Sequence, residues 1–141
     1  MIEKIRAGKN YVPELSLIAE LNNKIVGHIL FSKIKISGHS IYNSLALAPM
    51  AVLPEYQKRG IGTKLVLKGL ERAKQLGFCS VIVLGHKDFY SKFGFQRASS
   101  WNIKCPFQVP DEAFMAIELS EKALNGKPGV VQYTAEFYEV D

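Results

Sequence analysis

Two closely spaced glycines that follow an apolar run constrain the fold of this chain more than any other feature. The apolar run covers residues 45–53, and Gly60 and Gly62 stand at the head of a long amphipathic segment. Glycines let backbone amides approach a ligand, and a helix that begins there directs free N–H groups and the positive end of its dipole at that ligand. The sequence therefore predicts a strand, a loop and a helix whose N-terminus binds an anion such as a phosphate group.

Pro49 interrupts the apolar run at residues 45–53. A run that is apolar throughout is typical of a central strand. Proline has no N–H to donate to a neighbouring strand, so it does not fit a regular central ladder. We expect a bulge, or a point where two strands separate, close to Pro49.

The segment at residues 62–76 predicts an amphipathic helix. Its apolar residues recur at steps of three to five, its charged residues lie largely on the other side, and Gly77 is placed to end it. Gly69 inside this helix costs about 1 kcal/mol relative to alanine. We therefore expect the sheet to approach the helix closely at Gly69.

The rest of the chain reads as strands around this unit. Residues 15–20 and 25–35 are β-type runs joined by Asn22 and Asn23, a pair that suits the tight turn of a hairpin. The segment at residues 101–111, with two prolines, reads as a loop. A strand, a helix and a second strand in succession imply that the two strands pair in parallel through a right-handed crossover. The further elements are a strand at residues 80–84, a short helix at 88–93, and strands at 113–119 and 130–133.

Length and charge limit the classes of protein to consider. With 141 residues the chain is expected to form one domain over residues 1–141, and its net charge of +5 favours an anionic partner without choosing among nucleotide, nucleic acid and membrane. The glycine loop lacks the Gly-Lys-Ser/Thr of a Walker A motif and the third glycine of a dinucleotide fingerprint. The two cysteines, Cys79 and Cys105, have no metal-ligand spacing and are expected to be free thiols.

The amino terminus predicts neither secretion nor membrane insertion. Charged residues stand at positions 3, 4 and 6, where a signal peptide needs its apolar stretch. The apolar run at residues 45–53 is far shorter than a membrane span. We therefore expect a cytoplasmic protein that has no membrane partner.

Two motifs resemble those of a known enzyme superfamily. Residues 50–62, Met-Ala-Val-Leu-Pro-Glu-Tyr-Gln-Lys-Arg-Gly-Ile-Gly, resemble motif A of the GNAT superfamily of acetyl-coenzyme A-dependent N-acetyltransferases. Residues 90–95, Tyr-Ser-Lys-Phe-Gly-Phe, resemble the Tyr-x-x-x-Gly-Phe element that follows the next strand in that superfamily. From about residue 15 onward the chain looks like a bacterial subgroup labelled predicted N-acetyltransferases. Members normally begin with a strand and two helices, and from this resemblance we expect that those elements are missing before residue 15.

The resemblance implies a fold and a co-substrate. The fold is α/β (α+β): a mixed, mostly antiparallel sheet, splayed at a parallel pair and flanked by helices. The co-substrate is acetyl-coenzyme A, whose pyrophosphate would bind the amides from Lys58 to Thr63 and whose pantetheine arm would pair with the backbone of Met50 and Val52. No metal is implied. The residues assigned to coenzyme binding are Met50, Ala51, Val52, Gln57, Lys58, Arg59, Gly60, Ile61, Gly62 and Thr63.

Two side chains are candidates for proton transfer. Tyr90 corresponds to the residue that protonates the departing thiolate, although an aromatic packed beside Phe89 and Phe93 would read the same way. His86 would lie near the point where the strands separate, and a buried, hydrogen-bonded imidazole fits its position equally well. The sequence does not determine the general base.

Three functions remain open from the sequence. The first is an N-acetyltransferase that acts on a primary amine, a small molecule or a peptide, by direct attack in a ternary complex. The second is a non-catalytic sensor or degenerate scaffold that binds coenzyme A. A nucleic-acid-binding module fits least, because no base-reading helix or stacking platform accompanies Lys58 and Arg59. The sequence also leaves open whether the protein forms a homo-oligomer and which acceptor it uses. It does not decide whether the missing elements reflect truncation, a misplaced start or a degenerate protein.

Overall fold

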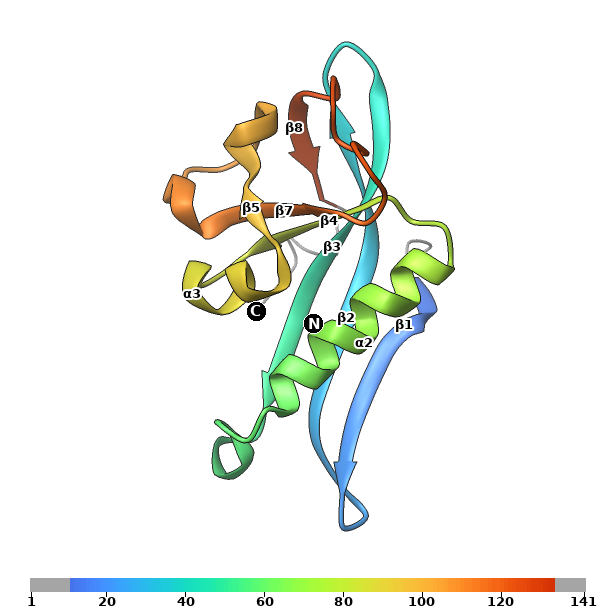
Figure 1. The fold of residues 1–141 in the computed structure, drawn as a ribbon, viewed down its shortest axis with the longest axis vertical. Coiled ribbons are helices and arrows are strands. Elements are labelled where there is room, and N and C mark those ends of the chain that lie inside the picture. Colours follow the sequence, from blue (N-terminus) through green and yellow to red (C-terminus); the bar gives the residue numbers. More distant parts are fainter. Residues whose placement is uncertain (1–10, 134–141) are drawn as a thin grey trace.

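A mixed sheet with one long helix on its face forms the frame of the protein. The computed structural model describes residues 11–133. Within that range the sheet has eight strands in the order β5-β7-β4-β3-β2-β8-β6, with β1 paired to β2 (Figure 1). The strands are β1 Tyr11–Leu21, β2 Lys24–Ser37, β3 Ile41–Val52, β4 Ser80–Leu84, β5 Gln96–Arg97, β6 Ile103–Lys104, β7 Phe114–Glu118 and β8 Gly129–Gln132.

The helical elements are short apart from one. None of the helices among residues 11–133 is long and apolar enough to cross a bilayer. The α-helices are α2 Ile61–Gln75 and α3 Lys87–Tyr90, and the 3₁₀ turns are η1 Pro54–Tyr56, η2 Ser91–Phe93, η3 Ala98–Trp101 and η4 Asp111–Ala113.

The first three strands form two successive hairpins. Asn22 and Asn23 both have positive φ values, 53° and 64°, and they connect β1 to β2 as the Asn-Asn pair predicted. The ladder between β2 and β3 extends from Gly27 opposite Val52 to Ser37 opposite Ile41. These long strands give α2 the surface on which it packs.

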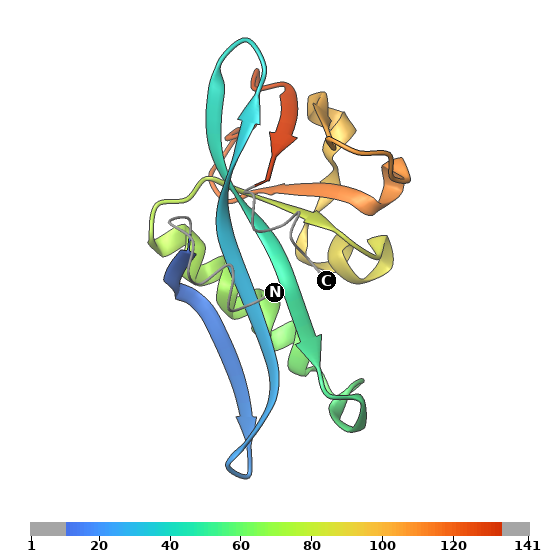
Figure 2. The ribbon, with the colours of Figure 1, turned by 180° about the vertical axis from the view of Figure 1, so that it is seen from behind.

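The sheet divides at the parallel pair of β3 and β4. The two strands are in register only at Leu45 with Val81 and at Ala46 with Ile82, and beyond these positions β3 stays with β2 while β4 stays with β7. In Figure 1 the two strands leave their meeting point in different directions, and Figure 2 shows the same separation from behind. The splayed, mixed sheet expected from the resemblance is therefore confirmed.

A bulge in β3 accompanies this division. Ile29 of β2 lies opposite Met50, whereas Phe31 lies opposite Leu47. One residue of β2 is thus matched by the two residues Ala48 and Pro49, whose peptide bond is cis. The irregularity expected at Pro49 is therefore present. A regular ladder would require an N–H at this position, and proline has none.

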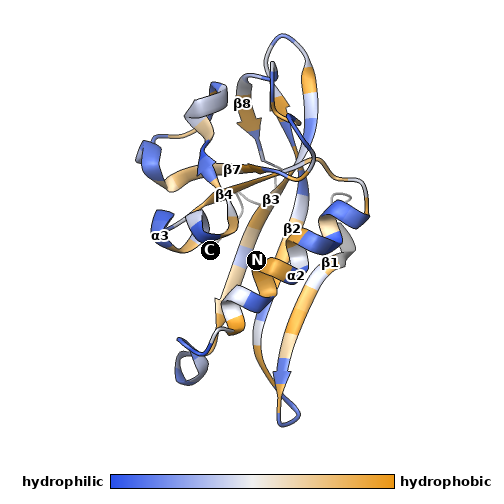
Figure 3. Ribbon diagram, viewed as in Figure 1, coloured by the Kyte–Doolittle hydropathy of each residue, from blue (hydrophilic) through white to orange (hydrophobic). Residues whose placement is uncertain are grey.

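Apolar residues cover both faces of the sheet. On one face, Phe31, Leu45 and Val83 pack against α2, which buries Leu65, Val66, Gly69, Leu70 and Ala73. On the other face, Ile36, Ile82 and Phe114 form a second cluster that the loops around β6 and β8 help to enclose. Figure 3 shows hydrophobic residues along β3, β4 and β7 and hydrophilic residues in the connecting loops.

The segment at residues 101–111 is not the simple loop that its prolines indicated. Ile103–Lys104 forms β6, which pairs in parallel with β8 at Gly129 and Val130. A strand of two residues has almost no pattern of its own, and it forms because a segment more than twenty positions later lies beside it. The expected helix at residues 88–93 is likewise divided into α3 and η2.

Gly69 lies where α2 approaches the sheet most tightly. A Cβ atom added to Gly69 would lie 2.3 Å from Cε1 and 2.6 Å from Cζ of the Phe31 ring. Phe31 is fully buried in the core, so its ring has little room to move aside. The close packing expected from a glycine inside a helix is confirmed.

Replacing Gly69 with alanine should lower the free energy of unfolding by about 1–3 kcal/mol, because overpacking outweighs the better helix propensity of alanine. Urea denaturation followed by circular dichroism measures this change. In the double variant Gly69→Ala with Phe31→Leu, the loss should be smaller than the sum of the two single losses. An alanine variant that is more stable than the parent would show that α2 and β2 have space between them.

Candidate functional site

A pocket of about 710 Å³ lies between the end of β3, the loop around η1 and the N-terminus of α2. It contains every residue assigned to coenzyme binding from the sequence except Arg59. It also contains Tyr56, Phe89 and Lys92, which that assignment missed. The lining residues are Met50, Ala51, Val52, Tyr56, Gln57, Lys58, Gly60, Ile61, Gly62, Thr63, Phe89 and Lys92.

The N-terminus of α2 supplies unpaired amides to this pocket. Gly60 caps the helix with a φ of 80°, and no side chain caps it. The Lys64 N–H donates to the Gly60 carbonyl oxygen at 3.0 Å, which is the first bond of the helix. The N–H groups of the three preceding residues, Ile61 to Thr63, therefore have no partner within the helix and stand at the positive end of its dipole.

Gly62 leaves space between three of the lining side chains. A Cβ atom built on Gly62 would lie 3.7 Å from Cζ of Phe89 and 3.8 Å from both Cε of Met50 and Cγ2 of Val52. These are ordinary contact distances, so a methyl group would fit the fold while it occupied part of the pocket. The missing side chain thus leaves room for a ligand to approach the helix amides.

The free edge of β3 forms a second wall of the pocket. The Leu53 N–H donates to the Val26 carbonyl oxygen of β2 at 2.8 Å. Successive residues of a strand present their N–H groups to opposite edges, so the N–H groups of Val52 and Met50 face the edge that β4 has left. The side-chain amide of Gln57 donates to the Val52 carbonyl oxygen at 3.0 Å and ties the glycine loop to this edge.

Two lysines give the pocket a positive charge. Lys58 and Lys92 both line it, and the Lys92 Nζ lies 4.8 Å from the centroid of the Phe89 ring. Phe89 and Lys92 are three residues apart in successive helical turns, so their side chains share one face. The three-residue spacing predicts that the two side chains lie together, with Lys92 inside the second sequence motif and Phe89 just before it, but it does not predict that they face the glycine loop.

Arg59 does not line the pocket. Its guanidinium carbon lies 5.3 Å from the centroid of the Tyr56 ring, which Lys24 also approaches at 5.7 Å. Arg59 therefore helps to hold the loop against an aromatic side chain by a cation–π contact. The basic residue that the pocket has in addition to Lys58 is Lys92.

Tyr90 is part of the core beside the pocket. Only 8% of its surface is exposed, and its ring makes edge-to-face contacts with Phe89 at 4.9 Å and with Phe95 at 5.6 Å. Gly85 lies directly against the ring, because a Cβ there would come within 2.6 Å of it. Burial raises the pKa of the Tyr90 phenol, so the hydroxyl stays protonated at neutral pH. Tyr90 is not itself among the lining residues, but its ring contacts Phe89, which lines the pocket.

His86 is exposed at the start of α3. Its carbonyl oxygen accepts from the N–H groups of Phe89 and Tyr90 at 3.2 and 3.1 Å, which begins the helical turn. The buried imidazole that the sequence allowed is therefore not found. The structure does not place the His86 side chain among the residues that line the pocket.

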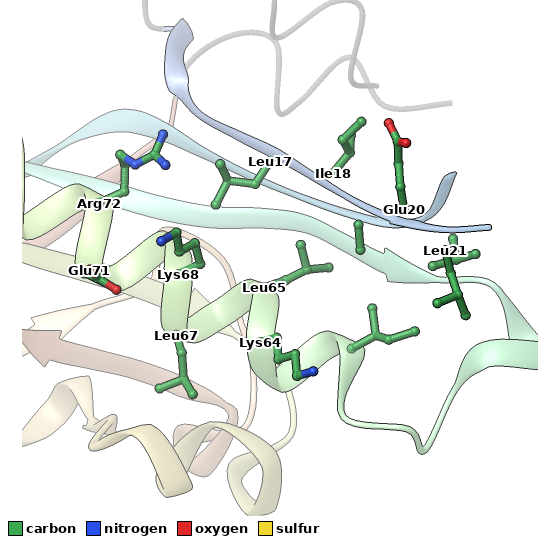
Figure 4. Close-up of a pocket in the computed structure, with 13 residues that line it drawn as sticks. Leu17, Ile18, Glu20, Leu21, Lys64, Leu65, Leu67, Lys68, Glu71 and Arg72 are labelled. Atoms are coloured by element: carbon green, nitrogen blue, oxygen red, sulfur yellow. The ribbon is translucent and has the colours of Figure 1, made fainter. Parts of the chain in front are cut away.

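A separate groove of about 660 Å³ lies between β1 and α2. Figure 4 shows Leu17 of β1 and Leu65 of α2 facing each other across it, with Lys64, Lys68 and Arg72 along the helix. Of the residues assigned to the coenzyme, only Ile61 borders this groove as well.

Comparison with known proteins agrees with the architecture of this site. The sequence model of the acetyltransferase (GNAT) family matches residues 2–95. The chain is 32% identical over 124 residues to YhbS of Escherichia coli K12, an uncharacterised N-acetyltransferase, and the match covers 87% of this chain and 74% of that protein. It is 39% identical over 102 residues to a second uncharacterised N-acetyltransferase of the same strain, YjhQ, over 71% of this chain and 56% of that protein.

Two crystal structures of relatives contain the coenzyme. One is YhbS from Escherichia coli in complex with CoA, with a TM-score of 0.90 and 28% identity over 99% of this chain and 77% of that one. The other is a GNAT family acetyltransferase from Brucella melitensis in complex with acetyl-CoA, with a TM-score of 0.75 and 30% identity over 96% of this chain and 75% of that one. The family match, the splayed sheet and the glycine loop at the N-terminus of α2 agree, and the chain belongs to the acetyltransferase (GNAT) family.

Proposed function

We propose that this protein is an N-acetyltransferase that transfers the acetyl group of acetyl-coenzyme A directly to a primary amine. The observation that carries the proposal is the pocket that is lined both by the uncapped N-terminus of α2 and by the end of β3. Such a pocket suits a ligand that has a phosphate group at one end and an amide-containing arm at the other. The complexes of the two relatives with CoA and acetyl-CoA support this choice of ligand.

The two walls of the pocket have different roles in this proposal. The amides of Ile61, Gly62 and Thr63, together with the charges of Lys58 and Lys92, would hold the pyrophosphate. The N–H groups of Met50 and Val52 would pair with the pantetheine arm as a neighbouring strand would. The space beside Gly62 supports the fit, because a side chain there would lie between the ligand and the helix amides.

The reaction requires a neutral amine. With a pKa near 10.4, only about one alkylamine in 2,500 is unprotonated at pH 7, so the ammonium proton must first be removed. The nitrogen then forms a bond to the carbonyl carbon of the thioester and loses a second proton, the carbon–sulfur bond breaks, and the sulfur takes up a proton, so that one proton is released to solvent overall. Positioning of the two substrates supplies a large part of the acceleration in reactions of this kind.

Tyr90 is the proposed donor of the proton to sulfur. Burial raises the pKa of this phenol and so keeps it protonated at neutral pH, as a donor requires, but the same shift makes it a weaker acid. The proposal for Tyr90 therefore rests on the resemblance of residues 90–95 to the family motif and on its contact with Phe89 of the pocket. His86 is the proposed relay of the amine proton to solvent, which its exposure at the start of α3 permits.

A non-catalytic sensor of coenzyme A is the second candidate. Neither Tyr90 nor His86 is among the residues that line the pocket, since Tyr90 lies in the core and His86 is exposed. Both observations favour this second candidate. Such a protein would bind coenzyme A and acetyl-coenzyme A but would acetylate no amine.

Titration calorimetry and a thiol-release assay together test both candidates. We expect acetyl-coenzyme A and coenzyme A to bind at micromolar concentrations, and thiol to be released when a primary amine is added. Binding without thiol release on a broad panel of amines would favour the sensor. If neither ligand bound below millimolar concentration, both candidates would be wrong.

Gly62→Val separates binding from folding. The larger side chain should weaken coenzyme A binding by tenfold or more, because it occupies the space between Phe89, Met50 and Val52. Its melting temperature should match that of Lys74→Val, which places the same side chain on an exposed position of the same helix. The Lys74 variant should bind coenzyme A normally. Normal binding by Gly62→Val would exclude the glycine loop as the phosphate site.

Tyr90→Phe tests the proton donor. Turnover should fall about tenfold or more while the dissociation constant for coenzyme A stays the same. The raised pKa favours the neutral phenol, so this contribution to stability is complete below the unfolded pKa of about 10 and is lost as the pH rises through the folded pKa. The parent should therefore lose more stability than the phenylalanine variant between neutral and strongly alkaline pH. Full turnover in the variant would remove Tyr90 from the mechanism.

A further inference from the structure

A second, smaller pocket lies at the same division of the sheet. It has a volume of about 210 Å³. Two of its residues, Ala46 and Ile82, form the last register pair that joins β3 to β4, and both belong to the core cluster on the face away from α2. The pocket thus begins where the gap between the strands begins. Its lining residues are Ala46, Leu47, Ala48, Ile82, Leu84, Phe107 and Tyr133.

None of the described residues that line this pocket carries a charged side chain. Phe107, from the segment between β6 and η4, and Tyr133, after β8, stack with ring centroids 6.0 Å apart and planes at 23°. Phe107 and Leu84 remain 45% and 42% exposed, so apolar surface is open to solvent at a concave site. An open apolar cavity with an aromatic wall is typical of a ligand-binding site.

The two pockets border the same stretch of β3. Residues 46–48 line the small pocket, residues 50–52 line the large one, and only Pro49 separates them. Two peptide units separate Ala48 from Met50, so their Cα atoms are at most about 7 Å apart. A small molecule in the apolar pocket would therefore lie within reach of a thioester at the end of an arm that follows Met50 to Val52.

We propose that the acceptor binds in this small pocket and is a primary amine with a short, flat, apolar substituent, as in an arylalkylamine. The proposal rests on the acetyltransferase function proposed above. The stacked Phe107 and Tyr133 offer an aromatic substituent favourable ring contacts. A polyamine fits poorly, because its second ammonium group would enter a lining in which residues 11–133 supply no carboxylate to pair with it.

Binding of three amines to the protein saturated with coenzyme A tests this directly. The amines are 2-phenylethylamine, ethylamine and putrescine, and their affinities can be measured by titration calorimetry. We expect 2-phenylethylamine to bind at least about tenfold more tightly than ethylamine, because its ring is removed from water. Putrescine should bind no better than ethylamine.

Variants at Phe107 test whether the preference for 2-phenylethylamine arises in the small pocket. Phe107→Ala should abolish the advantage of 2-phenylethylamine over ethylamine, and Phe107→Asp should make putrescine the preferred amine of the three. Ile41→Ala removes an apolar side chain that is 63% exposed and does not line the pocket, so it should keep the parental preference. Melting temperatures verify that all variants fold. We expect the Phe107 variants to fold because the Phe107 side chain is partly exposed and contributes little to the core.

The possible outcomes test the assignment of the acceptor pocket and the acetyltransferase function separately. Equal affinities for 2-phenylethylamine and ethylamine, or an unchanged preference in Phe107→Ala, would overturn the pocket assignment. Coenzyme A affinity should be the same in every variant, because Phe107 does not line the large pocket. A binding preference without thiol release would refute the acetyltransferase function and leave the pocket assigned. Thiol release with equal kcat/KM for the two amines would support the function and refute the pocket.

Discussion

β3 and β4 share two register pairs and then separate, and the site depends on that short contact. A longer parallel ladder would have used the N–H groups of Met50 and Val52 for strand pairing. The bulge at Ala48 and Pro49 lies beside the division, and β3 stays paired to β2 along its other edge. The separation therefore exposes backbone donors on one edge of a strand whose other edge stays hydrogen-bonded to β2.

The end of the large pocket that we propose for the pyrophosphate is made of backbone more than of charged side chains. Three helix amides and the dipole of α2 stand beside two lysines, and Arg59 is turned to Tyr56. Backbone donors keep their geometry because the helix fixes them, whereas long basic side chains lose conformational freedom when they bind. Gln57 adds to this rigidity, since its bond to Val52 ties the loop to the strand that forms the opposite wall.

Much of the frame could be predicted from local patterns. The Asn22-Asn23 turn, the irregularity at Pro49, the helix that starts near Gly60 and the tight approach at Gly69 follow from the backbone limits of asparagine, proline and glycine. The two-residue strand β6 could not be predicted, because it exists only through pairing with β8. The same reason applies to Lys92 and Phe89, which enter the pocket only because the turn after β4 faces the end of β3.

The sequence by itself determined the family, the glycine loop and most of the residues along the large pocket, because these lie within one continuous stretch of chain. The tertiary structure decided that Arg59 contacts Tyr56, that Tyr90 is buried, and that His86 is exposed. It also brought Phe107 and Tyr133 together beside Ala46 and Ile82. Such contacts join segments that are distant in the chain, and no local pattern of residues encodes which face of a divided sheet each distant segment will cover.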